Sequence, residues 1–506
     1  MQFNGGEKNM KKPIKLALAS LLLVGGMSSL AACNKDNFNG LTINFWHTFG
    51  QTVTDGVAKK AADFAAKVLK EENFSLRINL VYKGGYEDVK GEVEKGFGVG
   101  GNPTIAVAYP DHVADYLAID GNYVVNLKPF IDDETIGLGK ESYLGDTHSW
   151  EDIIESFREE SSNYIKEGVY SMPFLKSSEV MLYNFDLVKK AMPYWDSSII
   201  TDDDIKDRMK DLSWDDFMDF CEVIVDNKNA IDPDLEAPCF YDSDANLFIT
   251  KLKQNNKVYA GIKENGAGYI GFNGLPKNNP TPEQIAEYEW TQGMLKEYKE
   301  WYNKKLFTTK GVEGVYSSNW ITTKKSIFAI GSTGGSGYSF PATNEFTLGA
   351  CMVPYSNNNP VYVTQGPTLT VLNNINMIKA GTNDDAVKYA WKFIKYLTNE
   401  KVNADLCTTN SEGYVPVRTS AYSTTEFINF LNSKTQYVLV AKVIVEDMQH
   451  NYFSTPAFKG SANLRDQVAG CFADVMKLSK TLSDDDLEAA IKVILDRTID
   501  QSVPKM

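Results

Sequence analysis

Hydrophobic and polar positions alternate over residues 41–46, which is the pattern of a β-strand with one buried face. Residues 53–72 then repeat apolar positions at helical spacing, and further strand-like runs occupy 75–83 and 104–110, with a helical pattern over 86–97 between them. One face of the first helix collects Val53, Val57, Ala61, Phe64, Val68 and Leu69. Alternation of strand and helix predicts an α/β fold with a parallel sheet and helical crossovers.

Aromatic and polar residues follow each of the three predicted strands. They are Trp46 and His47 after the first, the segment 82–86 with Tyr86 after the second, and 109–111 with Asp111 after the third. Ligands of such sheets bind at the carboxyl ends of the strands, and aromatic faces stack on the C–H faces of sugars and polyols. These strand ends predict a ligand cleft, although aromatic residues there also simply seal a core.

The N-terminal segment has the pattern of an export signal. Lysines at 11, 12 and 15 precede an uncharged run over 16–24, which is too short for a membrane span. The segment 30–33, LAAC, resembles the lipobox of bacterial lipoproteins, so we expect a signal peptide over 1–32 and a lipid anchor on Cys33 at the start of a tether over 33–40. The alternative is an ordinary secretory signal, and Met10 is an alternative start to Met1.

Composition describes a globular protein of 506 residues, 43% of them hydrophobic, with a net charge of −15. Without a basic block, this charge argues against a nucleic-acid partner. Besides Cys33, five cysteines stand at 221, 239, 351, 407 and 471, and their odd number and spacing predict buried free thiols, with a Cys221–Cys239 bridge as the minor alternative. The four histidines are scattered, so no metal and no cofactor are expected.

Two motifs in the middle of the chain resemble known ligand-binding loops in part. GSTGGSG, at 331–337, follows a strand-like run and offers backbone N–H groups, but it lacks the GK[ST] ending of a nucleotide-binding loop. A segment starting at Asp242 begins like an EF-hand loop but has Leu247 and Lys253 where that loop needs glycine and glutamate. We therefore interpret Tyr241 and Asp242 as residues that line the cleft rather than as calcium ligands.

Eight segments, taken in order, resemble the extracellular solute-binding proteins of carbohydrate-type ABC importers. Those most similar to the glycerol phosphate-binding members are INFWHTFG, VYKGGYEDV and GYVPV, and the others include NPTIAVAYPDHVADY, VYSMPFLKSSEVMLYNFDLVKKA, LSWDDFMDFCEVI, LGACMVPY and LRDQVAGCFADVMK. The resemblance covers residues 41 to about 490.

The resemblance implies a two-lobed α/β fold of the type II periplasmic-binding-protein kind, each lobe a mostly parallel sheet flanked by helices. One lobe would comprise 41–177 and 354–412, and the other 178–353 and 416–506. Hinge crossovers would fall near 177–178, 352–354 and 413–415. It further implies a monomer that captures a carbohydrate or polyol phosphate outside the cytoplasm, anchored to the bacterial cell membrane, and delivers it to an ABC permease.

The ligand contacts implied by the resemblance carry over one by one. They are Tyr86, Ser177 or Ser178, Ser332 or Thr333, Gln365 with Gly366, Tyr414 and Arg465. An acidic residue expected directly after the third-strand tyrosine is replaced by Pro110, and Asp111 follows one position later. Arginine suits phosphate because its planar fork donates two parallel hydrogen bonds.

Other functions remain as alternatives. A binder of neutral mono- or oligosaccharides would use the same architecture. A surface glycoside hydrolase would need a pair of carboxylates about 5–10 Å apart, which an acidic chain supplies easily by chance. No GxSxG or metalloprotease motif supports an enzyme, and no repeats support a structural surface protein.

Overall fold

The computed structural model describes residues 38–264, 266–342, 345–410, 413–448 and 451–503. The predicted signal peptide, Cys33 and most of the tether lie outside these residues. Residues 41–506 form one unit by their contacts, and this unit contains two five-stranded sheets. None of the helices in the described part of the chain is long and apolar enough to cross a membrane.

The first sheet has the order β2-β1-β3-β13-β4. β1 pairs in parallel with β2 and β3, as the sequence predicts, whereas β13 is antiparallel to both of its neighbours, so four of the five strands run in one direction. The strands are β1 (Leu41–His47), β2 (Leu76–Tyr82), β3 (Ile105–Ala108), β4 (Met172–Pro173) and β13 (Thr368–Val371).

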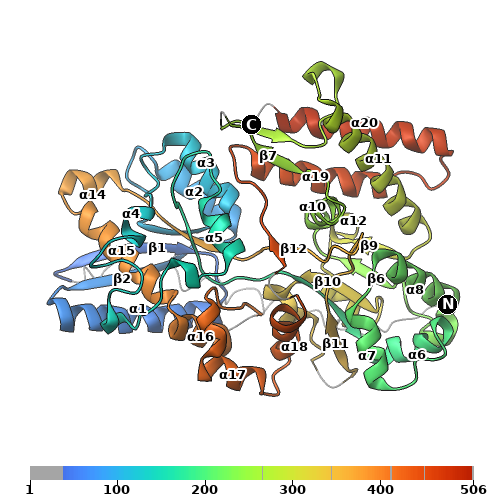
Figure 1. The fold of residues 1–506 in the computed structure, drawn as a ribbon, viewed down its shortest axis with the longest axis horizontal. Coiled ribbons are helices and arrows are strands. Elements are labelled where there is room, and N and C mark those ends of the chain that lie inside the picture. Colours follow the sequence, from blue (N-terminus) through green and yellow to red (C-terminus); the bar gives the residue numbers. More distant parts are fainter. Residues whose placement is uncertain (1–37, 265, 343–344, 411–412, 449–450, 504–506) are drawn as a thin grey trace, which may run out of the picture. The chain divides into compact units, whose positions relative to one another are not determined.

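Helices flank this sheet, and Figure 1 shows α1 and α15 beside β1 and β2. The helices are α1 (Gln51–Glu72), α2 (Tyr86–Gly96), α3 (Pro110–Asp120), α4 (Lys128–Ile131), α5 (Glu155–Ser162), α14 (Ile375–Ala380), α15 (Asn383–Leu397) and α16 (Glu400–Thr409), with short 3₁₀ turns η1 (Ser142–Leu144) and η2 (Trp150–Asp152). The predicted face of α1 is buried except for Leu69, which is 52% exposed because it lies at the edge of the apolar arc.

The second sheet has the order β11-β5-β10-β6-β9. Here β5 is antiparallel to both of its neighbours, β10 and β11, whereas β6 pairs in parallel with β10 and β9. Four of the five strands therefore run in one direction, and β5 runs in the other. Its strands are β5 (Glu179–Asn184), β6 (Cys239–Tyr241), β9 (Phe307–Thr309), β10 (Phe328–Ser332) and β11 (Leu348–Cys351). β5 lies inside the sheet, so each of its edges is hydrogen-bonded to a neighbouring strand.

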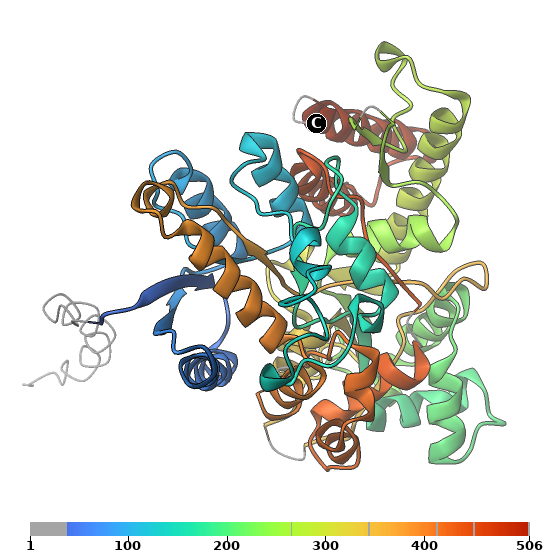
Figure 2. The same cartoon turned by 60° about the vertical axis from the view of Figure 1, so that its left-hand side comes forward.

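The helices around the second sheet come from the middle and the end of the chain. Figures 1 and 2 show α19 and α20 lying side by side. The elements are α6 (Phe185–Trp195), α7 (Asp202–Lys210), α8 (Trp214–Asp226), α9 (Lys228–Ile231), α10 (Asp244–Gln254), η3 (Pro276–Asn278), α11 (Pro282–Asn303), α12 (Lys310–Glu313), α13 (Ser317–Ile321), η4 (Thr333–Ser339), α19 (Ser461–Met476) and α20 (Asp484–Ser502), with the hairpin β7 (Ala260–Ile262) and β8 (Gly268–Ile270).

Between α16 and α19 the chain forms small elements that contact both halves. α17 packs against α16, whereas α18 packs against β11. Tyr422 and Tyr452 each pack against the core of both sheets. The elements are η5 (Thr419–Ser423), α17 (Thr425–Leu431), α18 (Tyr437–Lys442), the π-helical turn η6 (Val443–Asp447) and β14 (Tyr452–Phe453), which pairs with β12 (Tyr362–Val363).

Three segments lie side by side where the two halves meet, and the first of them is hydrogen-bonded to each of the other two. Lys176 and Val415 exchange backbone hydrogen bonds of 3.2 and 2.8 Å, and Ser177 and Gln365 exchange bonds of 3.0 and 2.9 Å. Residues 177–178 and 413–415 belong to two of these segments, and their role as hinge crossovers stays a prediction. The third predicted crossover, 352–354, directly follows β11, and on that connection it is Gln365 that bonds to the first segment.

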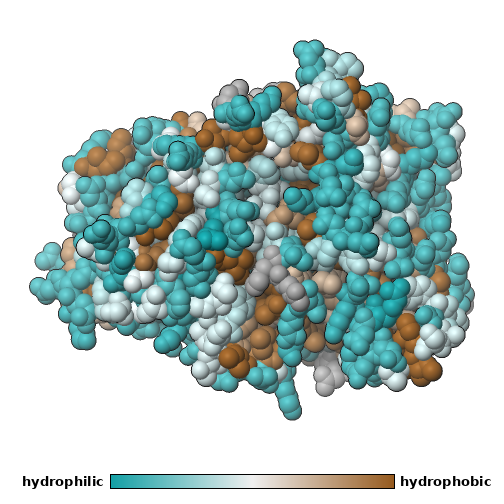
Figure 3. Space-filling model, viewed as in Figure 1, coloured by the Kyte–Doolittle hydropathy of each residue, from teal (hydrophilic) through white to brown (hydrophobic). Residues whose placement is uncertain are grey.

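The face of the molecule seen in Figure 3 is mostly hydrophilic, with scattered hydrophobic side chains. The five cysteines at 221, 239, 351, 407 and 471 are free and buried, as the sequence predicts.

Candidate functional site

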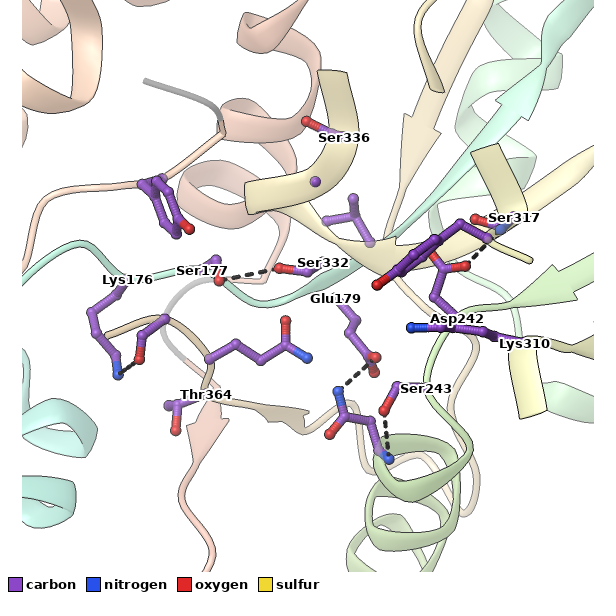
Figure 4. Close-up of a pocket in the computed structure, with 18 of the residues that line it drawn as sticks. Lys176, Ser177, Glu179, Asp242, Ser243, Lys310, Ser317, Ser332, Ser336 and Thr364 are labelled. Carbon is purple, nitrogen blue, oxygen red and sulfur yellow. Dashed lines mark hydrogen bonds between the residues drawn. The ribbon is translucent and has the colours of Figure 1, made fainter. Parts of the chain in front are cut away.

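A cavity of about 790 Å³ is lined by residues from both sheets and from the crossing segments. Tyr86, Tyr109 and Asp111 come from the strand ends of the first sheet, and Glu179, Asp242 and Ser332 from the second. Figure 4 shows Lys176, Ser177 and Thr364 on one side of this cavity and Asp242, Ser243 and Lys310 on the other. The cavity therefore lies between the two sheets, beside the segments that connect them, and strand ends of both sheets contribute to its wall.

Most of the residues predicted from the sequence line this cavity. They are Tyr86, Asp111, Ser177, Asp242, Ser332, Gln365, Gly366, Tyr414 and Arg465. Several hydroxyl-bearing neighbours join them, among them Ser243, Ser317, Ser318, Ser336, Ser339, Thr364, Ser454 and Thr455. The lining is thus rich in groups that both donate and accept hydrogen bonds.

Five predicted residues do not line it. Trp46 packs near α2 and α3, with the Lys83 ammonium 4.0 Å from its ring centroid. Ser178 is buried and donates a 2.8 Å hydrogen bond to the Val363 carbonyl. Thr333 is also buried, and its backbone N–H donates to the Ser178 carbonyl. Tyr241 lies beneath the cavity, where it donates to Glu179 over 2.6 Å.

His47, the fifth, lines a neighbouring cavity of about 720 Å³ that shares Tyr86, Tyr338 and Tyr414 with the first. Its ring stacks on Phe49 with 5.3 Å between centroids, and its Nδ1 accepts a 3.3 Å bond from the Phe49 N–H. Burial lowers the pKa of this imidazole. The neutral ring therefore carries its proton on Nε2.

The aromatic part of the cavity wall is a stacked pair. The rings of Tyr86 and Tyr109 lie 4.0 Å apart between centroids and are inclined by 18°. Burial raises the pKa of Tyr109 to about 12 and that of Tyr86 well above its usual value. Both hydroxyls therefore remain protonated and able to donate hydrogen bonds.

Acidic groups of the cavity come from both sides. Glu179, at the start of β5, is 3% exposed, and burial raises the pKa of its carboxyl to about 7, against the opposing effect of hydrogen bonds from Tyr241 and Asn246. Asp242 accepts a 2.6 Å bond from the Ser317 N–H, and burial raises its pKa as well. Asp111, in the first turn of α3, accepts a 2.9 Å bond from the His112 N–H.

Basic groups face these acids. Lys176 forms a buried ion pair with Glu160 over 2.6 Å and donates to the Gly366 carbonyl over 3.1 Å. Lys310 lies 3.7 Å from the ring centroid of Tyr316. Arg465, on α19, donates to the side-chain oxygen of Asn246. The cavity wall thus carries both positively and negatively charged side chains, together with hydroxyl and aromatic groups.

Two polar atoms of the lining are buried without a hydrogen-bond partner among the described residues, namely Ser336 Oγ and Gln365 Oε1. Buried polar groups are normally satisfied, so these atoms are suited to a partner inside the cavity. No cluster of metal-ligating side chains occurs in the part of the chain that the structure describes, and Asp242 bonds to the Ser317 backbone instead.

Tyr109 lines the cavity and belongs to the strand end 109–111 that predicted the cleft, although it was not among the single predicted contacts. Sequence reasoning missed Glu179, Asn246 and Lys310 as lining residues, and these three had no signal. Glu179 precedes an ordinary apolar strand, Asn246 lies in a helix, and Lys310 follows a short strand whose partners are distant in sequence.

Comparisons with known proteins agree with this architecture. The profile of the bacterial extracellular solute-binding proteins matches residues 61–434. No curated protein sequence matches the chain significantly.

Solved structures match over nearly the whole chain. The GacH receptor of Streptomyces glaucescens, solved unliganded and with acarbose, is 15% identical, with a TM-score of 0.61 over 91% of this chain and 99% of its own. The cyclic α-maltosyl-1,6-maltose binding protein of Arthrobacter globiformis is 16% identical, with a TM-score of 0.63 over 91% and 99%. UgpB of Mycobacterium tuberculosis, solved with glycerophosphocholine, is 16% identical, with a TM-score of 0.58 over 90% and 99%. These likenesses confirm the predicted type II binding-protein fold.

Proposed function

This chain belongs to the family of bacterial extracellular solute-binding proteins, and we propose that it captures a carbohydrate or polyol in the cavity between its sheets and delivers it to an ABC permease. The observation that carries this proposal is the cavity lining, in which the stacked Tyr86 and Tyr109 adjoin many hydroxyl groups. Aromatic faces and hydroxyl-bearing side chains are the complement of a polyhydroxylated ligand.

Two versions of this ligand have support in the cavity. A polyol phosphate is favoured by Arg465 and Lys310, since a charge-assisted hydrogen bond to phosphate is strong in a buried site. A neutral sugar or polyol is favoured by Asp111, Glu179 and Asp242, since carboxylates accept bonds from hydroxyls but repel phosphate. The solved neighbours include proteins with acarbose and with glycerophosphocholine, so both versions have precedent in this fold.

The mechanism that we propose is hinge closure. The two sheets are the cores of two lobes, and the paired crossing segments at Lys176, Gln365 and Val415 are the hinge. A ligand that contacts side chains of both lobes stabilises the closed state by its preference for that state. The predicted lobe boundaries, the lipid anchor at Cys33 and the monomeric state belong to this proposal.

A thermal-shift panel tests the proposal. The full chain carrying Cys33→Ser is heated with glycerol 3-phosphate, glycerophosphocholine, glucose, sorbitol, maltose and buffer alone. A compound at 100 times its Kd adds about 2.7 kcal/mol of stability and visibly raises Tm. A shift with the phosphates alone supports the phosphate version, and a shift with the neutral compounds alone supports the other. If none of the compounds raises Tm, the carbohydrate assignment is contradicted.

A further inference from the structure

Glu179 is a buried carboxylate whose protein partners are neutral. Its Oε2 accepts from the Tyr241 hydroxyl over 2.6 Å, and its Oε1 accepts from the Asn246 side-chain amide over 2.7 Å. Figure 4 shows the carboxylate directed toward the side of the cavity lined by Ser243. A carboxylate offers about four acceptor positions, so two bonds leave capacity for further donors from the cavity.

Asn246 links Glu179 to the arginine of the cavity. Its side-chain oxygen accepts from the Arg465 guanidinium, while its side-chain nitrogen donates to Glu179. Because a guanidinium only donates hydrogen bonds, it determines which end of the amide faces it. The NH₂ group is thereby held toward Glu179, and the amide cannot turn its oxygen toward the carboxylate without losing both bonds.

The elements around Glu179 supply few other charges. Asp242, after β6, disfavours the ionised carboxylate, and Arg465, on α19, favours it. Tyr241 remains a neutral donor because burial and the neighbouring Glu179 raise its pKa well above its usual value. The Asn246 amide separates the Glu179 carboxylate from the Arg465 guanidinium. The remaining acceptor positions of the carboxylate therefore suit uncharged donors such as hydroxyl groups.

We propose that Glu179 anchors the ligand by accepting hydrogen bonds from its hydroxyl groups, and that Asn246, oriented by Arg465, is the positioning residue that aims the carboxylate. The inference rests on the proposed carbohydrate or polyol function. It assigns Arg465 a role that needs no phosphate, because the guanidinium acts on the ligand through Asn246 and Glu179.

Calorimetric titration of the full chain with sorbitol, maltose and glycerol 3-phosphate tests this inference. Wild type is compared with Glu179→Gln, Asn246→Ala and Arg465→Ala, and each variant is first checked for folding by circular dichroism. The matched control is Asp244→Asn. Asp244 is another buried carboxylate, on the same helix as Asn246, and it bonds to Thr309 and Gly311 rather than lining the cavity.

For a neutral probe that binds wild type, we expect Kd to rise roughly 10- to 100-fold in Glu179→Gln and about 10-fold in Asn246→Ala and Arg465→Ala. Asp244→Asn should keep the wild-type Kd. Because hydroxyls donate best to the ionised carboxylate, wild-type affinity should fall roughly tenfold from pH 8 to pH 6, and the Glu179→Gln profile should be flat.

The outcomes separate the two proposals. If wild type binds none of the three probes, the carbohydrate or polyol function is contradicted and the inference falls with it. If wild type binds a neutral probe but Glu179→Gln binds it within threefold of wild type, or keeps the same pH profile, only the role of Glu179 is overturned. If Arg465→Ala loses glycerol 3-phosphate binding but keeps wild-type affinity for the neutral probes, the proposed role of Arg465 in orienting Asn246 is contradicted. If Glu179→Gln does not fold, Asn246→Ala and the wild-type pH profile decide.

Discussion

Lys176 and Glu160 form an ion pair of 2.6 Å in which both side chains are almost completely buried. Lys176 belongs to the first segment that passes between the sheets, and its ammonium also holds the Gly366 carbonyl of the second. Thr364 donates to the other oxygen of Glu160 over 2.9 Å. One buried charge pair therefore joins α5 to two of the three crossing segments.

Removing one partner of this pair should be costly. We expect Lys176→Ala to lower the free energy of unfolding by about 3–5 kcal/mol, because it leaves Glu160 buried and unpaired. Urea denaturation measures the change. The exposed pair Lys325–Glu236 has the same 2.6 Å separation, so Lys325→Ala, expected to cost at most about 1 kcal/mol, is the control. Equal effects in the two variants would contradict the structural role of Lys176.

The stacked tyrosines should matter for affinity. We expect Tyr86→Ala to weaken binding of any sugar that shifts Tm roughly 10-fold or more, and Tyr86→Phe to retain most of the affinity, because the ring face supplies the contact. Another stacked pair, Phe97 and Tyr123, lies outside the cavity lining with 4.4 Å between centroids. Tyr123→Ala should reduce stability without changing Kd, and a loss of affinity there would argue against a specific contact at Tyr86.

Stability should depend on pH through Glu179. Burial raises the pKa of this group to about 7 from an ordinary value of 4.5, so the folded protein holds a proton that the unfolded chain releases. The contribution to stability is complete below pH 4.5 and is lost as the pH rises through about 7. Relative to wild type, Glu179→Gln should therefore become more stable by roughly 2.5 kcal/mol between pH 5 and pH 8.5. Urea denaturation at both pH values measures this, and a constant difference would contradict it.

Gly413 should not tolerate a side chain. Its φ is +94°, and a Cβ atom would lie 1.7 Å from the Thr333 carbonyl oxygen. We expect Gly413→Ala to lower the free energy of unfolding by about 2 kcal/mol or more. Gly470 is exposed within α19 with nothing near its Cβ position, so Gly470→Ala should instead stabilise by about 0.5–1 kcal/mol. Chemical denaturation compares both variants, and a neutral Gly413→Ala would show that this crossing segment adapts.

The buried thiols should be unreactive in the native protein. Burial raises the pKa of all five, that of Cys471 to about 12. In protein with Cys33→Ser, a thiol reagent should modify none of them at pH 8 within minutes and all five after unfolding in guanidinium, because the thiolate is the reactive form. Rapid native labelling of any of them would mean that its surroundings open.

The sequence predicted the first sheet well because its signals are local. The alternation of residues 41–47 and the helical spacing after it need no knowledge of distant partners. The same alternation does not tell which residue at a strand end lines the cavity. Trp46 and His47 point to opposite faces of the sheet, and neither lines the main cavity. Which face is covered depends on helices that arrive later in the chain.

Glu179 shows why the rest could not be predicted. In sequence it is an acid in front of an apolar run, which is typical of a solvated strand start. It is buried because β5 lies between β10 and β11, strands that begin about 150 residues later, and because Tyr241 and Asn246 converge on it from two further elements. Such a group depends on long-range pairing, which periodicity does not encode.

The crossing of the chain from one sheet to the other separates its two ends. The first strand, β1, belongs to one sheet, and the last helix, α20, packs with elements around the other. In the proposed closure, the two ends of the folded chain would therefore move with different halves of the molecule. Fluorophores attached beside Leu41 and after Ser502 would report opening and closing as a change in energy transfer, without any label inside the cavity.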